Sequence, residues 1–217
     1  MNLDLFEQRA DIWRGRSAFP QANPGIPTGF TDLDALLPGG GWPNGALTEI
    51  LSDPGSVSLR ESRGNGALWL TMPALAQLSQ QSRWLTWIAP PHIPYAPALT
   101  NMGIDLTKVL LVHPKTQTDT LWALEQALRS GTCSAVLAWL NYVDPKSLRR
   151  LQLAAETGKT WGLLFCQRRN APSGSTAALR LKVEPTYEGV AVEILKRRGG
   201  WPVRPLQLRF GDARLNV

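Results

Sequence analysis

Short apolar runs recur along the chain and alternate with segments of helical periodicity. Five of these runs are bounded by turn-forming residues and predict buried strands: Ala46–Leu51, Trp84–Ala89, Lys108–His113, Ser134–Leu140 and Thr160–Phe165. Between them, helices are predicted over residues 66–81, 95–102, 119–129 and 145–157. Strands that are apolar on both faces must be covered on both faces. We therefore expect an α/β fold, a doubly wound and mostly parallel sheet with helices on both faces.

The last third of the chain has a different pattern. Leu179–Val183 alternates apolar and basic residues, and Val190–Leu195 and Leu206–Phe210 also have strand character, with Gly-rich turns between them. This pattern predicts a C-terminal antiparallel β-meander from about residue 178, packed on the edge of the parallel sheet. We expect an N-terminal arm over residues 1–24 and a single domain over residues 25–217.

Composition excludes several classes of protein. The chain has 217 residues, and no apolar run approaches the roughly 18 residues that a membrane span requires. Its start, MNLDLFEQRADIW, lacks the basic and apolar regions of a secretory signal. The two cysteines, Cys133 and Cys166, lie in apolar runs and are expected to be buried, reduced thiols. We expect a cytoplasmic protein with no membrane partner and no metal site.

Basic residues are concentrated in the C-terminal third. Residues 146–217 hold fourteen Lys or Arg against five Asp or Glu. Two clusters, Arg168-Arg169 and Lys196-Arg197-Arg198, lie in polar, turn-rich stretches. Guanidinium and ammonium groups bind phosphates and acidic surfaces, so these five residues are candidate contacts for single-stranded DNA or a partner protein. Ordinary solvated turns are the alternative.

Nine tryptophans are present, which is many for this length. Five of them lie in or beside predicted elements and are interpreted as core or groove packing: Trp42, Trp69, Trp84, Trp87 and Trp139.

The stretch before the first predicted strand resembles the RecA family. The resemblance rests on Gly25–Asp34, Leu36-Leu37, Gly39–Gly41, Pro43, Gly45 and Leu47–Ile50. In that family, such a stretch leads into the first core strand and the phosphate loop. The resemblance implies a RecA-like fold over roughly residues 25–210.

The nucleotide site of that family is not preserved. A phosphate loop of the form GxxxxGK[ST] needs two glycines, a lysine and a hydroxyl. The matching segment keeps Gly55 but has Ser52 and Val57 at the glycine positions, Ser58 at the lysine position and Leu59 at the hydroxyl position. The strand 134–140 ends without an acid, and Pro90-Pro91-His92 follows strand 84–89 where the family has a glutamate. We expect a pseudo-ATPase with no catalytic residue and no cofactor.

Two groups of RecA-like proteins are similar to the chain. Residues 68–169 resemble SulA-type proteins, through Pro73–Leu78, Gln81–Pro90, Leu106–Val109, Ala127–Gly131 and Trp139-Leu140. With both flanks included, the chain resembles ImuA-type proteins more. This second resemblance implies a non-catalytic accessory protein of SOS-induced translesion DNA synthesis. It would link RecA or single-stranded DNA to an ImuB-like inactive Y-family polymerase and an error-prone replicative-type polymerase. The alternative is a SulA-type cell-division inhibitor that binds FtsZ.

Overall fold

The structure is a computed structural model that describes residues 24–52, 66–167, 174–198 and 204–212. The predicted N-terminal arm, residues 1–24, lies outside these residues except for Pro24. The elements in chain order are α1 (Thr31–Leu36), β1 (Leu47–Ser52), α2 (Gly66–Ser79), β2 (Trp84–Ile88), α3 (Ala96–Asn101), the 3-10 helix η2 (Leu106–Lys108), β3 (Val109–Val112), α4 (Gln117–Arg129), β4 (Cys133–Leu140), α5 (Pro145–Gly158), β5 (Trp161–Gln167), β6 (Leu179–Pro185), β7 (Gly189–Arg197) and β8 (Leu206–Arg209).

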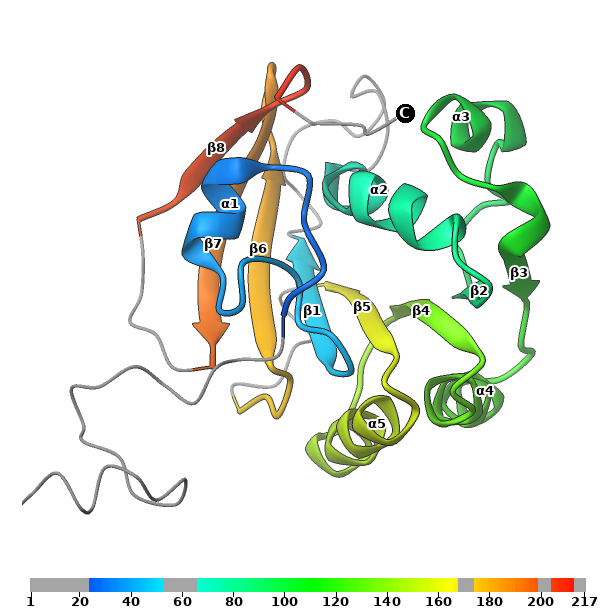
Figure 1. Ribbon diagram of the computed structural model, residues 1–217. Helices are drawn as coiled ribbons and strands as arrows, with labels where there is room; N and C mark the ends of the chain where they lie inside the picture. The colour runs from blue at the N-terminus through cyan, green and yellow to red at the C-terminus, as the bar shows by residue number, and fades with distance from the viewer. Residues whose placement is uncertain (1–23, 53–65, 168–173, 199–203, 213–217) are drawn as a thin grey trace, which may run out of the picture.

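The eight strands form one sheet in the order β3-β2-β4-β5-β1-β6-β7-β8 (Figure 1). The pairs from β3 to β6 are all parallel, and the pairs β6–β7 and β7–β8 are antiparallel. The prediction of a mixed α/β fold with a mostly parallel sheet is therefore confirmed. The five predicted apolar runs are β1 to β5.

Helices cover both faces of the parallel part. α2 and α3 lie on one face, and α4 and α5 lie side by side on the other (Figure 1). The α2 face contains a core in which the rings of Trp42 and Trp161 stack with centroids 5.3 Å apart. The indole Nε1–H of Trp161 donates to Thr48 Oγ1 at 3.1 Å, so this large side chain is buried without losing its hydrogen bond. Leu47, Leu124 and Leu151 belong to a separate core beneath α4 and α5.

The C-terminal strands extend the sheet rather than pack on its edge. β6 pairs in parallel with β1, which places a basic strand beside the central strand. Arg180 of β6 lies opposite Glu49 of β1, and Arg180 Nε is 3.3 Å from Glu49 Oε2. Both side chains are largely buried, so each charge is compensated by the other in a region poor in water.

Two local features add to the predicted elements. The helix predicted over residues 66–81 is α2, which begins at Gly66 and continues through a buried Pro73 to Ser79. Tertiary burial stabilises the helix enough to tolerate the missing backbone N–H. The turn-rich stretch before β1 also contains α1, where the Thr28 backbone N–H donates to Asp34 Oδ1 at 2.9 Å. Among the described residues, helices fall short of the length and hydrophobicity that crossing a membrane would require.

We predict that Gly158→Ala destabilises the fold by about 1–3 kcal/mol, because overpacked sites cost that much. A Cβ at Gly158 would lie 2.0 Å from the backbone oxygen of Leu128, where α5 approaches the end of α4. Urea unfolding followed by circular dichroism measures the change. Gly174→Ala is the matched control, since a Cβ there has no atom within 4 Å. Equal midpoints for the two variants would contradict the close helix approach.

Candidate protein-interaction surface

The degenerate phosphate loop is described only at its first residue. Ser52 is the last residue of β1 and is half-buried. Gly55, Val57, Ser58 and Leu59 lie outside the described residues. Arg168 and Arg169, the first predicted basic cluster, also lie outside them.

The second basic cluster is described, and each of its side chains contacts another part of the chain. Lys196 Nζ donates to the Ser175 backbone oxygen at 2.5 Å, and Arg197 donates to the backbone oxygen of Leu36. Arg198 pairs with Glu156 of α5 at 2.9 Å. The three cations therefore bind three different segments rather than pointing into one site. Their contact with DNA or a partner stays a prediction.

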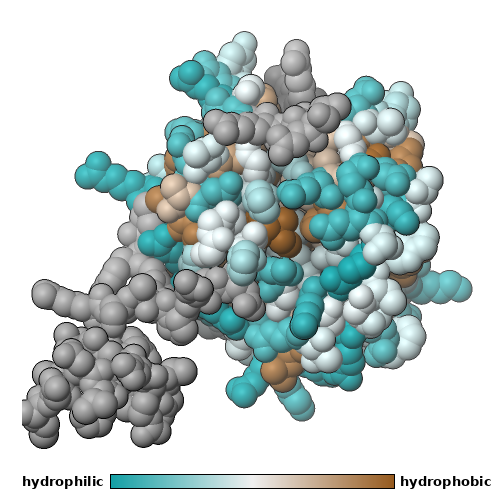
Figure 2. Space-filling view, viewed as in Figure 1, coloured by the Kyte–Doolittle hydropathy of each residue, from teal (hydrophilic) through white to brown (hydrophobic). Residues whose placement is uncertain are grey.

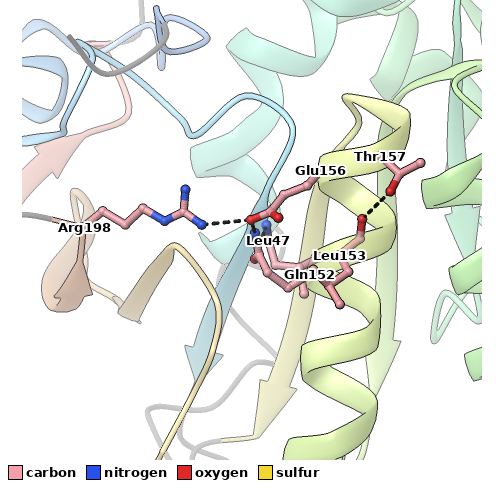
Figure 3. A network of polar contacts seen from close by, with 6 residues as sticks. All are labelled: Leu47, Gln152, Leu153, Glu156, Thr157 and Arg198. Atoms are coloured by element: carbon pink, nitrogen blue, oxygen red, sulfur yellow. Dashed lines mark hydrogen bonds and ion pairs between the residues drawn. The ribbon is translucent and has the colours of Figure 1, made fainter. Parts of the chain in front are cut away.

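Arg198 belongs to a polar network that joins α5 to β1 and the end of β7 (Figure 3). The Leu47 backbone N–H at the start of β1 donates to Gln152 Oε1 at 3.0 Å. Gln152 Nε2 in turn donates to Glu156 Oε1 at 2.8 Å, the atom that also accepts from Arg198. The network thus gives the buried Leu47 N–H a hydrogen-bond acceptor, and it ends at the exposed ion pair of Glu156 with Arg198.

The two cysteines do not form a nucleophilic site. Both Cys133 and Cys166 are free and buried, as the sequence predicted. Burial, with a smaller contribution from the nearby Glu49 carboxylate, raises the pKa of Cys166 to about 12. A thiol with that pKa is protonated at neutral pH and unreactive, because the thiolate is the attacking species. No group of three or more His, Cys, Asp or Glu among the described residues could hold a metal ion.

Exposed apolar side chains gather at the β3 end of the sheet instead. We define the β3-edge patch as Trp84, Leu106, Lys108, Leu110 and Leu111. Leu110 and Leu111 are consecutive in β3 and lie on opposite faces of the sheet, so the patch includes both sides of its edge. Trp84 is 44% exposed and Leu110 is 48% exposed, so two large apolar side chains face solvent at this end of the sheet. Figure 2 shows hydrophobic side chains at the surface on the side where Figure 1 places α3 and β3.

The geometry of the patch combines a ring, a cation and a strand edge. Lys108 Nζ lies 6.0 Å from the centroid of the Trp84 ring. β3 is the terminal strand of the sheet, so its outer edge has no strand neighbour among the described residues. Open, apolar strand edges and clustered exposed hydrophobic residues mark protein-interaction sites.

Arg83 holds the start of β2 in place beside this patch. Its guanidinium donates to the backbone oxygens of Gly158 at 2.9 Å and Lys159 at 3.1 Å, and to Thr160 Oγ1 at 3.2 Å. These carbonyls belong to the C-terminal end of α5, where a cation is favourable. The next residue, Trp84, is thereby fixed at the surface.

The sequence interpretation missed the β3-edge patch. Trp84 was predicted to pack in a core or groove, together with Trp42, Trp69, Trp87 and Trp139. Trp42 and Trp87 are buried, but Trp84, the first residue of β2, is exposed. The signal for this surface in the sequence is Lys108, a charged residue that directly precedes the apolar strand.

We predict that Gln152→Leu destabilises the protein by about 1–3 kcal/mol, because it leaves the buried Leu47 N–H without an acceptor. Glu156→Gln is the control in the same network. Its amide oxygen can still accept from Gln152, and the change removes the charge that pairs with Arg198 at the surface, a pair worth at most about 1 kcal/mol. Both changes are measured by urea unfolding. If Gln152→Leu were as stable as Glu156→Gln, the Leu47 contact would not support the fold.

Comparison with known proteins points to one family. The family model "Cell division inhibitor SulA" matches residues 57–162. The SulA of Edwardsiella piscicida is 40% identical over 96 residues, 44% of this chain and 57% of the relative. The SulA of Yersinia pestis (strain Pestoides F) is 34% identical over 114 residues, 52% of this chain and 68% of the relative. The structure of SulA from Pseudomonas aeruginosa aligns over 55% of this chain and 97% of that chain, with 29% identity and a TM-score of 0.44.

These comparisons correct the sequence-based function. The interpretation as a translesion-synthesis accessory protein is wrong, since the matched family and relatives are named as cell-division inhibitors. The partners inferred with it, an ImuB-like polymerase, RecA and an error-prone polymerase, are wrong for the same reason. The ImuA-type resemblance depended on the segments that flank the SulA-like region. The family match lies instead within residues 57–162. The similarity to SulA-type proteins is confirmed.

Proposed function

Because the chain belongs to the SulA family, we propose that it is a cell-division inhibitor that binds FtsZ and blocks septation. The observation that carries the proposal is the 34% identity over 114 residues, 68% of a relative named as a cell-division inhibitor. The chain spans 57% of the Edwardsiella piscicida relative, so the activity of the whole relative is proposed here rather than transferred.

The β3-edge patch is the surface we propose for FtsZ. All of its residues lie within residues 57–162, the part that matches the family model, whereas Lys196–Arg198 lie outside that part. Its exposed tryptophan and leucines supply apolar area, and Lys108 supplies a charge that selects an acidic neighbour. Exposed residues of this kind give a binding surface without requiring any catalytic group.

Binding alone is sufficient for inhibition of a polymerising partner. A protein that binds the free subunit lowers the concentration available for assembly, by mass action. The loss of polymer then depends on the molar ratio of inhibitor to subunit. A catalytic inhibitor would instead act far below equimolar amounts.

We predict that the purified chain reduces GTP-dependent FtsZ sedimentation in proportion to its concentration, approaching complete loss near equimolar amounts. Overexpression is expected to produce filamentous cells with few septa. Normal sedimentation at a molar excess, together with normal cell length, would contradict the proposal.

We predict that Lys108→Glu weakens FtsZ binding by about tenfold or more, because it reverses the only charge in the β3-edge patch. Lys146→Glu, the same charge change on the exposed start of α5, is the matched control and should bind like the parent chain. Titration of labelled FtsZ measures both affinities. Equal weakening by the two variants would indicate a general charge effect rather than a contact at β3.

We also propose that the sheet has RecA-like architecture and that the protein works without hydrolysing ATP. The central position of β1, between β5 and β6, supports the architecture. At the end of β4, Trp139 stacks on Phe165 with centroids 4.8 Å apart, and Asn141 follows where an acid would be needed. Calorimetric titration with Mg-ATP tests the proposal, and micromolar binding with turnover would refute it.

A further inference from the structure

A second apolar surface follows β2, on a loop held at both ends. We define the proline loop as residues 89–95, Ala89 to Tyr95, which contain three prolines. The Ala89 backbone N–H donates to the Val112 backbone oxygen of β3 at 2.9 Å. At the other end, Tyr95 is the N-cap of α3, and its backbone oxygen accepts from the N–H groups of Ala98 and Leu99 in that helix.

The backbone of the proline loop has few alternatives. Pro90, Pro91 and Pro94 each have a restricted φ, and each restricts the residue before it. Ala89 has a φ of 50°, in the left-handed region that residues with a Cβ seldom adopt. Unfavourable backbone conformations of this kind persist where the surrounding structure holds them, often at functional sites. The conformation seen is therefore largely set before any partner binds.

This stiff loop presents two large side chains to solvent. Ile93 is 80% exposed and Tyr95 is 73% exposed, while Pro90 and Leu99 on either side are buried. The buried neighbours fix the loop, and the exposed pair contributes nothing to the core. Residues 89–101 contain no Asp, Glu, Lys or Arg.

We infer that the proline loop inserts Ile93 and Tyr95 into an apolar, uncharged recess of FtsZ. The inference rests on the proposed function and adds a second contact to it. The absence of cations in residues 89–101 disfavours a nucleic acid, because phosphate binding needs them. A rigid loop loses little conformational entropy on binding, which favours a partner with a matching recess.

Continuity with the β3-edge patch favours FtsZ over other occupants. Ala89 is hydrogen-bonded to Val112, one residue beyond Leu111 of the patch. A partner that covers the end of β3 therefore lies next to the loop. Lys108 supplies the charged contact, and the proline loop supplies the apolar one.

The experiment compares the double variant Ile93→Ser/Tyr95→Ser with the parent chain, full length, by titration of labelled FtsZ. We expect FtsZ affinity to fall by about tenfold or more, since exposed aromatic and aliphatic anchors dominate binding energies. The melting temperature should not change, because neither side chain is buried. Tyr187→Ser, which removes a fully exposed tyrosine at the β6–β7 turn, is the control and should retain parent affinity.

A second variant tests whether the rigidity of the proline loop contributes to FtsZ affinity separately from its two exposed side chains. Pro91→Gly leaves both side chains in place and loosens the loop, so binding should weaken several-fold if the loop is held ready for its partner. The loss of FtsZ affinity caused by the double variant should persist at high salt, because the contact is apolar. The loss of affinity caused by Lys108→Glu should become smaller, because salt screens the charge.

The outcomes distinguish the two levels of the proposal. If the parent chain does not bind FtsZ, the proposed function and this inference both fail. If the parent binds and the double variant binds equally well, only the inference fails.

Sedimentation velocity of the parent chain and of the double variant tests whether a second copy of the chain, rather than FtsZ, binds the proline loop. A parent dimer that dissociates in the double variant, with FtsZ affinity unchanged, would assign the loop to a second copy of the chain and overturn the inference.

Discussion

The pairing of β1 on both of its edges is the constraint on which the rest of the molecule depends. β1 is bonded to β5 on one side and to β6 on the other, both in parallel. It thereby joins the segment that matches the SulA family model, β2 to β4 with their helices and the start of β5, to α1 and the C-terminal strands. Without β1, the family-matching part and the C-terminal meander would be separate sheets with open edges.

Two buried polar arrangements hold β1 in this position. Glu49 is compensated by Arg180 of β6, and the Leu47 N–H is satisfied by Gln152 of α5. Unpaired, each group would carry a desolvation cost comparable to a large part of a domain's net stability. These contacts favour one register of β1 over its neighbours, because a shift by one residue would separate both pairs.

The proposed function uses surfaces and no reactive group. Among the described residues, the cysteines are buried and no cluster of acids and histidines could bind a metal ion. The basic side chains of Lys196, Arg197 and Arg198 bind other segments of the chain. By contrast, Trp84 and Leu110 at the β3 edge and Ile93 in the proline loop are held outward by buried neighbours. The proposed function rests on these exposed side chains.

The sequence by itself determined the α/β class, the five parallel strands and the two buried thiols, because uninterrupted apolar runs have few other stable arrangements. It also indicated the similarity to SulA-type proteins through local matches such as Gln81–Pro90. Only the tertiary structure decided that Trp84 is exposed and that Glu49 faces Arg180. It also decided that the cluster at Lys196–Arg198 is bound within the chain. The physical reason is that hydrophobic periodicity is a local property of the chain. Exposure at a strand end and the partner of a buried charge depend instead on which distant segments the fold brings together.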